Sequence, residues 1–402
     1  LIKTHKFSKL FLKNKNIKYK FQVINLYPEF DENKNSLKFS EYDLQKIRKV
    51  NLDLLVQFGS TSFKGDILNI CTNGIISLGT SDYNEIFNNY AGFWEVYFRN
   101  PRTGFKITRE NKESNGAEII YRGYIETSFI YTLNLARFYE ISNHFLHKII
   151  GEILSGNHRF LNAKYSININ PKFLIPNLFH LFFYLIKTLI LLIKKFYQII
   201  LGKSYRWGVA YQFVSTWKGV NLTQFLKIKN PKNRFLADPF LIKKNNHYYC
   251  FVEDYDFSSK KGSISAFKIT LNKFENLGYV LKEDFHLSFP FIFEFENQLY
   301  MCPETHEKKE IRIYKCIDFP SKWVFQKTLI KNVSAADTVI FKTNGKWWLL
   351  TNIDQSEFNC HGNQLHIYHS KHPLNDEWIP NTSNPVIFDP LKARNGGLIL
   401  QN

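Results

Sequence analysis

Cysteine is scarce in this sequence, and its spacing excludes the sites that cysteine usually builds. Only five residues are cysteine, and no two of them form a C-x-x-C pair; they are Cys71, Cys250, Cys302, Cys316 and Cys360. An odd number of widely spaced cysteines fits neither a disulfide framework nor a zinc site. The pattern is typical of reduced thiols, so we expect a cytoplasmic protein that holds no metal.

Arginine is also scarce, which weakens the functions that the strong positive charge would suggest. The formal net charge is +18, but only 11 of the 53 basic residues are arginine. Such a charge would suit a nucleic acid or an anionic membrane. We interpret the lysines as spread over every segment by a compositional bias, so we expect a solvated surface and no nucleic-acid partner.

The chain lacks an initiating methionine and a secretory signal pattern, and it stops within a repeated pattern. We therefore expect a fragment of a longer protein. Its 402 residues are enough for two domains with their own cores. A hydrophobic fraction of 44% and an aromatic fraction of 17% predict a folded chain throughout.

A pattern of seventeen positions in the second half is the main signal for the fold. It occurs without a gap in residues 237–253 (ADPFLIKKNNHYYCFVE), 288–304 (SFPFIFEFENQLYMCPE) and 336–352 (ADTVIFKTNGKWWLLTN). Each copy has an apolar run, a polar turn and an aromatic-rich run, which predicts a β-hairpin. The copies start 51 and 48 residues apart, a period typical of repeat folds. Residues 205–402 are therefore predicted to form a five-bladed β-propeller, truncated in its fourth blade.

Two positions of this pattern carry carboxylates. Position 2 holds Asp238, Phe289 and Asp337, and position 17 holds Glu253, Glu304 and Asn352. In a propeller the first strand of each blade lines the axis and the second runs back beside it, so both positions should meet on one face. Four carboxylates would then converge in a cleft, where like charges push their pKa values apart.

Paired carboxylates are the usual requirement for chemistry at a glycosidic bond. We expect Asp238 to act as base or nucleophile, Glu304 as acid and Asp337 as a positioning group or pKa modulator. Substrate-binding roles are expected for Glu253, Arg394 and Asn352. The alternative is that each carboxylate caps a turn at a strand end.

Some further side chains near the expected cleft have two interpretations. His306 and His361 follow second strands and either face the channel or lie in solvent. Trp347 and Trp348 are interpreted as blade packing rather than as a platform for a sugar.

The most apolar part of the chain is residues 173–201, which are predicted to form a linker helix within a linker over 166–204. Six polar residues lie along one narrow stripe of it: Asn177, His180, Tyr184, Lys187, Lys194 and Gln198. Such a helix packs against its own protein or lies flat at a membrane interface, where it would provide a peripheral membrane contact. A membrane span is the third alternative, but Lys187 near the centre argues against it.

Residues 1–165 are predicted to form an α/β domain. Apolar runs predict strands over 52–58, 93–98, 104–108 and 118–121, and a turn followed by a strand within 66–78, with Gly74 as the break. Residues recur with helical spacing in 40–50 and 132–153, which predicts a helix in each of these segments.

The motifs LDLLVQFG, GIISLGTSD, AGFWEVYF, TGFKIT and SNGAEIIYRG resemble, in this order, the later part of the formyltransferase domain of methionyl-tRNA and sugar-amine formyltransferases. The resemblance implies a Rossmann-type domain that uses 10-formyltetrahydrofolate when active. The positions of that family's catalytic Asn, His and Asp hold Ser77, Gly79 and Ser114 here. Without a base to take the amine proton, we expect an inactive domain and no cofactor; the alternative is an active sugar-amine formyltransferase.

Residues 205–402 carry the stronger resemblance. The Asp before Pro in FLADPF resembles the catalytic segment of five-bladed glycoside hydrolases of the arabinanase and invertase type. Together with SFPFIFEFENQLYMCPET, AADTVIF, GKWWLL and ARNGG, it resembles more closely the N-terminal propeller of plant glucosamine inositolphosphorylceramide transferases. The resemblance implies a protein that modifies or binds a carbohydrate or glycolipid, although a separate C-terminal domain of those transferases carries the glycosyl transfer.

Overall fold

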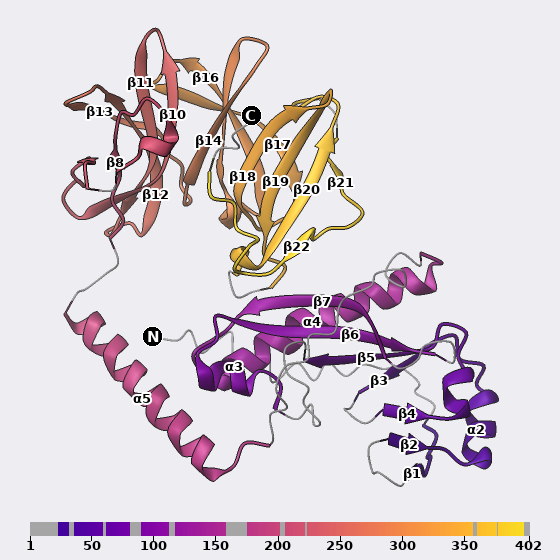
Figure 1. The fold of residues 1–402 in the computed structure, drawn as a ribbon. Coiled ribbons are helices and arrows are strands. Elements are labelled where there is room, and N and C mark those ends of the chain that lie inside the picture. The colour runs from indigo at the N-terminus through magenta and orange to yellow at the C-terminus, as the bar shows by residue number, and fades with distance from the viewer. Residues whose placement is uncertain are drawn as a thin grey trace. The chain divides into compact units, whose positions relative to one another are not determined.

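A computed structural model describes residues 23–31, 36–58, 62–80, 90–111, 117–157, 175–201, 206–221, 223–356, 360–375 and 377–397. The chain forms two compact units, Leu1–Ile190 and Leu191–Asn402, which divide within helix α5 (Leu178–Ile200). Figure 1 shows the elements of each unit.

The described part of the first unit contains two small mixed sheets, each with parallel and antiparallel pairs of strands. In one, β1 (Glu29–Phe30) pairs antiparallel with β2 (Ser36–Lys38), and β2 pairs parallel with β4 (Ser62–Lys64). In the other, β3 (Leu55–Gln57) and β5 (Ile75–Thr80) are parallel, and β6 (Arg102–Glu110) and β7 (Glu118–Glu126) continue it antiparallel. The described part of this unit is an α/β structure, as predicted, while its formyltransferase-like character stays a prediction.

In the described residues, helices α2, α3 and α4 accompany these sheets. Helix α2 (Glu41–Arg48) begins after Ser40, whose hydroxyl accepts a hydrogen bond from the Asp43 amide at 3.2 Å, as an N-cap residue does. Helix α4 (Tyr131–Leu154) packs on β6 and β7, where the Phe145 and Tyr121 rings stack at 5.2 Å. Both helices lie where the sequence predicts them.

The prediction of a strand over residues 93–98 is wrong, because this segment forms helix α3 (Phe93–Phe98). Its ends, Gly92 and Arg99, have left-handed backbone conformations, and the side chains of Phe93, Trp94 and Val96 are buried. A short apolar run buried on all sides shows no helical period. Residues 66–78 agree with the prediction of a turn and a strand, since the 3₁₀ turn η1 (Asp66–Asn69) lies ahead of β5.

The second unit is built from three antiparallel sheets that follow one another along the chain. The first is β10 (Arg234–Lys244), β11 (His247–Asp256), β12 (Lys261–Ile269) and β13 (Phe274–Leu281). The second is β14 (Ser288–Phe295), β15 (Gln298–Glu304), β16 (Glu310–Asp318) and β17 (Lys322–Lys331). The third is β18 (Ala335–Thr343), β19 (Lys346–Ile353), β20 (Gln364–Ser370) and β21 (Ile379–Pro380), with β22 (Ile387–Phe388) also paired to β20.

A short pair of strands, β8 (Ala210–Tyr211) and β9 (Leu226–Lys227), precedes these sheets. The described residues of this unit also form the 3₁₀ turns η4 (Trp217–Gly219), η5 (His306–Lys308) and η6 (His361–Asn363). The sheet-rich, all-β character of this unit agrees with the prediction, and the number of five blades stays a prediction.

All three predicted hairpins are present, and their turns explain their register. The two-residue turns are Asn245–Asn246, Glu296–Asn297 and Asn344–Gly345, and both residues of each turn have positive φ. This is the geometry of a type I′ turn, whose twist matches that of the flanking strands. The core lies between neighbouring sheets: Phe251 of the first sheet packs with Ile292 and Met301 of the second, and Phe293 of the second packs with Trp347 of the third.

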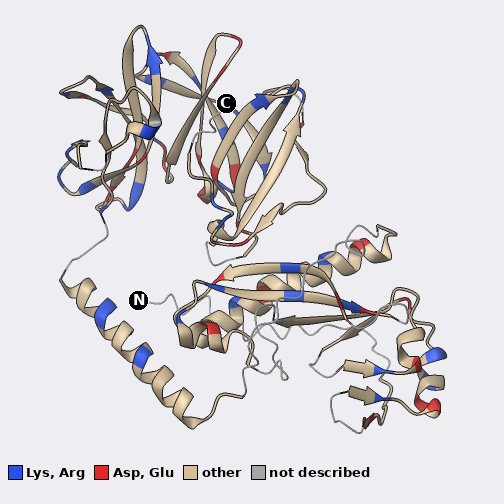
Figure 2. Ribbon diagram, in the orientation of Figure 1, with Lys and Arg blue, Asp and Glu red and all other residues tan. Residues whose placement is uncertain are grey.

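Helix α5 contains lysine but neither Asp nor Glu (Figure 2). In the described part of the chain, no helix is both long enough and apolar enough to cross a membrane.

Candidate functional site

The residues at position 2 of the repeat share one unusual backbone conformation. Asp238, Phe289 and Asp337 have φ of 48°, 46° and 51°, which is the left-handed region that non-glycine residues seldom adopt. Each lies at a register shift of its hairpin, so each is the extra residue of a β-bulge. A bulge bends its strand and changes the direction of a side chain. The same bulge in three successive sheets therefore positions these three side chains alike.

Strand register brings position 17 beside position 2, as predicted. Ala237 pairs with Glu253, Ser288 with Glu304 and Ala336 with Asn352. The first strands of the sheets, β10, β14 and β18, are neighbours in space. The four carboxylates thus gather from three sheets: the charge of Glu304 raises the pKa of Asp238, Glu253 and Asp337, and the charge of Asp238 raises the pKa of Glu253 and Asp337.

Glu253 is the carboxyl group with the strongest tendency to stay protonated. It is 7% exposed, and burial together with the nearby charges of Asp238 and Glu304 raises its pKa to about 8. A carboxyl group with such a pKa carries its proton at neutral pH. Glu253 can therefore donate a proton there, a role for which the sequence does not single it out.

Glu304 is held in the opposite state. Burial favours its protonated form, but the contact with His306 and the positive charge of that ring lower the pKa of Glu304. The Oε1 atom of Glu304 lies 2.6 Å from Nδ1 of His306, and this contact raises the pKa of His306 in turn. The pair is therefore an ionised carboxylate beside a histidinium.

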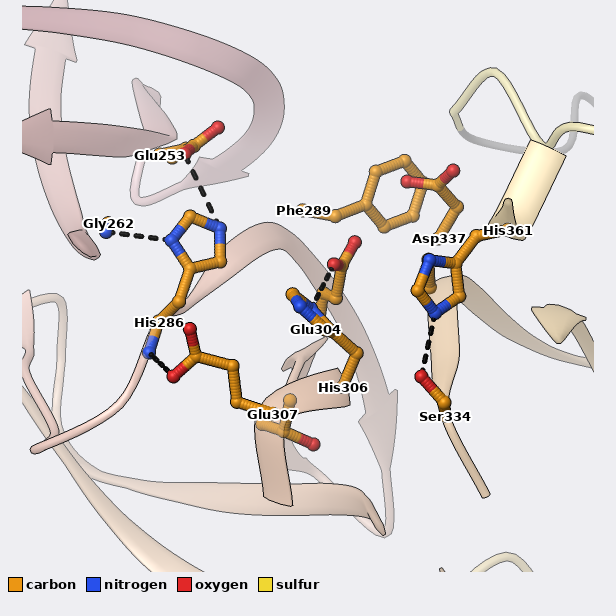
Figure 3. A network of polar contacts seen from close by, with 12 residues as sticks. Glu253, Gly262, His286, Phe289, Glu304, His306, Glu307, Ser334, Asp337 and His361 are labelled. Atoms are coloured by element: carbon orange, nitrogen blue, oxygen red, sulfur yellow. Dashed lines mark hydrogen bonds and ion pairs between the residues drawn. The ribbon is translucent and has the colours of Figure 1, made fainter. Parts of the chain in front are cut away.

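His286 forms the second acid–histidine pair of the site (Figure 3). The Gly262 amide donates to His286 Nδ1 at 2.9 Å, so the imidazole is neutral with its proton on Nε2. Nε2 faces Oε1 of Glu253 at 3.6 Å, and burial lowers the pKa of His286. A neutral pair, Glu253 with His286, thus lies beside the ionised pair, and the two histidine rings are 5.9 Å apart.

The aspartates at position 2 have different partners. Asp337 is 2% exposed and accepts a hydrogen bond from Nε of Arg394 at 2.8 Å. Burial nevertheless raises the pKa of Asp337 to about 6. Asp238 is half-buried and accepts a hydrogen bond from the Phe289 amide at 3.3 Å. Burial and the charge of Glu304 raise the pKa of Asp238, while the Phe289 amide and Arg394 favour its ionised form.

Asn352 is tied into the fold. It is fully buried, and its side-chain amide donates to the backbone oxygens of Gln364 at 3.0 Å and Ala393 at 2.8 Å. Its Oδ1 accepts from the Asn395 amide at 2.9 Å. Asn352 therefore anchors the segment that carries Arg394, and both hydrogens of its amide are used. Its predicted role in substrate binding stays a prediction that this arrangement does not favour.

Two further sequence interpretations can be placed. Trp347 is buried and packs edge-on against Phe293 and Phe295, with ring centroids 5.9 and 5.5 Å away, which confirms it as blade packing. His361 belongs to the site: its ring lies 5.3 Å from that of His306, and its Nε2 is 2.9 Å from Ser334 Oγ.

The histidines are the part of the site that sequence reasoning largely missed. His286 lies two residues before the second repeat copy, and His306 lies two residues after it. In the first copy these flanking positions hold Phe235 and Tyr255, which are paired in register and stacked at 4.8 Å. Extending the alignment by two positions at each end would have brought the two histidines together.

The positions that correspond to a formyltransferase active site offer no base in the described residues. Ser77 shares a hydrogen bond of 2.7 Å with Thr108 on the next strand, and Gly79 has no side chain. Ser114 lies outside the described residues. Within the described ranges, no group of three or more His, Cys, Asp or Glu side chains has a geometry that could hold a metal ion. All five cysteine side chains are buried as thiols.

Comparison with known proteins matches the second half to one family. Residues 201–401 match the family described as "Glucosamine inositolphosphorylceramide transferase 1, N-terminal". The chain belongs to this family. The match confirms the resemblance read from FLADPF and the related motifs. It does not extend to the first half, where the formyltransferase resemblance gains no support from it.

Curated relatives agree with the family. The chain is 37% identical over 176 residues to glucosamine inositolphosphorylceramide transferase 1 of Oryza sativa subsp. japonica, covering 42% of this chain and 23% of the relative. It is 36% identical over 173 residues to the protein of the same name in Arabidopsis thaliana, covering 42% and 22%. The chain thus spans less than a quarter of the length of these relatives.

Solved structures with partial similarity are glycoside hydrolases. One is Zg3597, a family 117 glycoside hydrolase from Zobellia galactanivorans, with 10% identity, a TM-score of 0.32, and coverage of 46% of this chain and 62% of that one. Another is an exo-1,5-alpha-L-arabinanase from a bovine ruminal metagenomic library, with 14% identity, a TM-score of 0.30 and coverage of 38% and 57%. TM-scores of this size do not by themselves establish a shared fold.

Proposed function

We propose that the second unit binds the sugar headgroup of a glycolipid and promotes transfer or cleavage at its glycosidic bond. The observation that carries the proposal is the pair of neighbouring carboxyl groups with opposite protonation: the pKa of Glu253 is raised to about 8, whereas that of Glu304 is lowered. Two carboxyl groups whose environments push their pKa values apart are what acid and base roles at one bond require.

In the proposed reaction, Glu253 gives its proton to the glycosidic oxygen as the bond from that oxygen to the anomeric carbon breaks. The electron pair of the broken bond stays on the oxygen, and the proton neutralises it. Asp238, the more exposed aspartate of position 2, either attacks the anomeric carbon or removes the proton of the attacking hydroxyl group.

The remaining charged groups set these protonation states. Glu304 stays ionised beside His306, so in this proposal it is not the acid that the sequence predicts. Its negative charge instead raises the pKa of Glu253, Asp238 and Asp337. Asp337, held by Arg394, keeps the predicted role of positioning group and pKa modulator.

The substrate class is inferred from the relatives. They are named for glucosamine inositolphosphorylceramide, which joins an amino sugar to a phosphorylated lipid headgroup. We therefore propose a hexosamine-bearing inositolphospholipid as the substrate of this chain.

The test uses the full chain with glucosaminyl inositolphosphorylceramide in detergent micelles, and mass spectrometry detects released or transferred sugar. Glu253→Gln and Asp238→Asn should each lower turnover by about 100-fold or more, as loss of a general acid or base does. Glu275→Gln, at an exposed position of β13, is the matched control and should leave turnover unchanged.

Calorimetry with the same lipid separates catalysis from binding. Affinity without any product in the wild-type protein would replace the catalytic proposal with the alternative of a carbohydrate-binding protein. Turnover that survives both Glu253→Gln and Asp238→Asn would refute the assignment of the two roles.

A further inference from the structure

Helix α5 is fixed to the first unit through its polar stripe. The Tyr131 amide donates to Tyr184 Oη at 3.0 Å, and the Lys187 ammonium lies 4.2 Å from the Tyr97 ring centroid. The His180 ring meets the Trp94 ring edge-on at 4.9 Å, and Thr188 is 8% exposed. His180, Tyr184 and Thr188 therefore face protein, whereas Lys187 contacts the Tyr97 ring and stays exposed.

The opposite side of α5 is apolar and exposed, the reverse of an ordinary surface helix. Sixteen large apolar side chains between residues 178 and 201 are at least 37% exposed: Leu178, Phe179, Leu181, Phe182, Phe183, Leu185, Ile186, Leu189, Ile190, Leu192, Ile193, Phe196, Tyr197, Ile199, Ile200 and Leu201. A helix of 23 residues is about 35 Å long, so this face forms a long apolar surface. Exposed apolar patches of such size mark interaction sites.

The charge around this helix is of one sign. Residues 153–237 contain 13 Lys and Arg and no Asp or Glu, whereas the rest of the chain has 40 basic and 35 acidic residues. The basic residues are spread along the whole chain, as expected, and it is the acidic residues that are missing from this segment. Most of the net charge of +18 lies in the segment that contains α5 and flanks it on both sides.

We propose that α5 lies flat in the surface of an anionic lipid bilayer, with its apolar face among the acyl chains. An apolar face combined with basic residues is the signature of an interfacial helix, and basic residues next to it bind anionic headgroups. The absence of acidic residues in residues 153–237 matches a negatively charged surface. Of the sixteen exposed side chains of this face, Tyr197 alone carries a polar group, so the face offers little that would select a protein partner. This inference does not depend on the proposed function.

The test is co-sedimentation of the full chain with vesicles. Phosphatidylcholine vesicles are compared with vesicles that also contain phosphatidylserine. The wild-type protein should bind the anionic vesicles more strongly, and added salt should weaken this preference.

Two variants separate the apolar and the charged contributions. Leu189→Glu with Ile193→Glu places two charges on the apolar face and should lower binding to anionic vesicles by about tenfold or more. Lys194→Gln with Lys195→Gln should remove most of the preference for phosphatidylserine. Leu271→Glu, at an apolar residue that is 64% exposed in the second unit, is the matched control and should bind like the wild type.

Circular dichroism of each variant verifies that the fold is kept. The proposal is overturned when the folded wild-type protein binds neither kind of vesicle, or when Leu189→Glu with Ile193→Glu binds as well as the wild type. Light scattering tests the alternative that a second copy of the chain covers the apolar face. In that case the wild-type protein is a dimer that does not bind lipid, and Leu189→Glu with Ile193→Glu converts it to a monomer.

Discussion

Replacing Glu253 with Gln should change how the stability of the protein depends on pH. In the folded protein burial raises the pKa of Glu253 to about 8, from an ordinary value of 4.5. Between these two values the folded protein holds a proton on Glu253 that the unfolded chain has released. Stability from this group is therefore complete below about pH 4.5 and is lost as the pH rises toward 8.

The magnitude follows from the size of this shift. Each pH unit within the window costs about 1.4 kcal/mol, so Glu253 alone should lower the free energy of unfolding by on the order of 4 kcal/mol between pH 5 and pH 8. Gln keeps the shape of protonated Glu but does not titrate. The free energy of unfolding of Glu253→Gln minus that of the wild type should therefore be larger at pH 8 than at pH 5, by on the order of 3 to 4 kcal/mol.

Urea unfolding, followed by tryptophan fluorescence at pH 5 and pH 8, measures this difference. Trp323, Trp347 and Trp378 are buried in the second unit and report on its packing. Glu275→Gln, an exposed carboxyl group on β13, is the control and should follow the wild type at both pH values. An equal stability difference between Glu253→Gln and wild type at pH 5 and pH 8 would show that Glu253 is ionised in the folded protein, which contradicts its role as proton donor.

Three further substitutions test the rest of the site. His306→Gln removes the cation beside buried Glu304, and urea unfolding near pH 7 should show a loss of about 3 to 5 kcal/mol. Arg394→Met removes the partner of Asp337, so carboxyl ¹³C NMR should place the pKa of Asp337 above its present value of about 6. Gly262→Ala places a Cβ atom against the backbone oxygen of Leu287 and 3.0 Å from both Glu253 Oε1 and His286 Cε1, and unfolding should show a loss of about 1 to 3 kcal/mol.

Each of these three predictions has a control or an outcome that would contradict it. His247→Gln, at an exposed position beside a turn, should leave stability unchanged, and an equal effect of both histidine substitutions would contradict the ion pair. Gly362→Ala meets no atom within 4 Å and should be tolerated. A pKa of Asp337 that does not change in Arg394→Met would mean that the hydrogen bond between them has no electrostatic consequence.

The hairpins could be predicted because local signals agreed with one another. Residues 237–253, 288–304 and 336–352 combine apolar runs with turn residues that accept positive φ, such as Asn245, Asn246 and Gly345. Hairpin geometry then determines which residues lie opposite each other, so the meeting of positions 2 and 17 followed from the alignment alone.

Other features depend on packing that no local pattern shows. Phe93, Trp94, Glu95 and Val96 are buried one after another, so segment 93–98 carries no apolar period that would mark it as a helix. His286 and His306 flank the β14–β15 hairpin just outside the seventeen aligned positions, so the alignment does not include the two rings that lie 5.9 Å apart. The protonation states of Glu253 and Glu304 also depend on burial and on these histidines, so the sequence could name the carboxyl groups but not assign their roles.

The left-handed bulge at position 2 makes this fold a practical scaffold for engineering. The same backbone angle, within a few degrees, is kept by Asp238, by Phe289 and by Asp337. The conformation is therefore held by the sheet and not by the chemistry of the side chain. Asp is tolerated in this conformation better than Phe. Carboxylates can thus be added or removed one sheet at a time on an unchanged backbone, and the charge of the site can be varied independently of its shape.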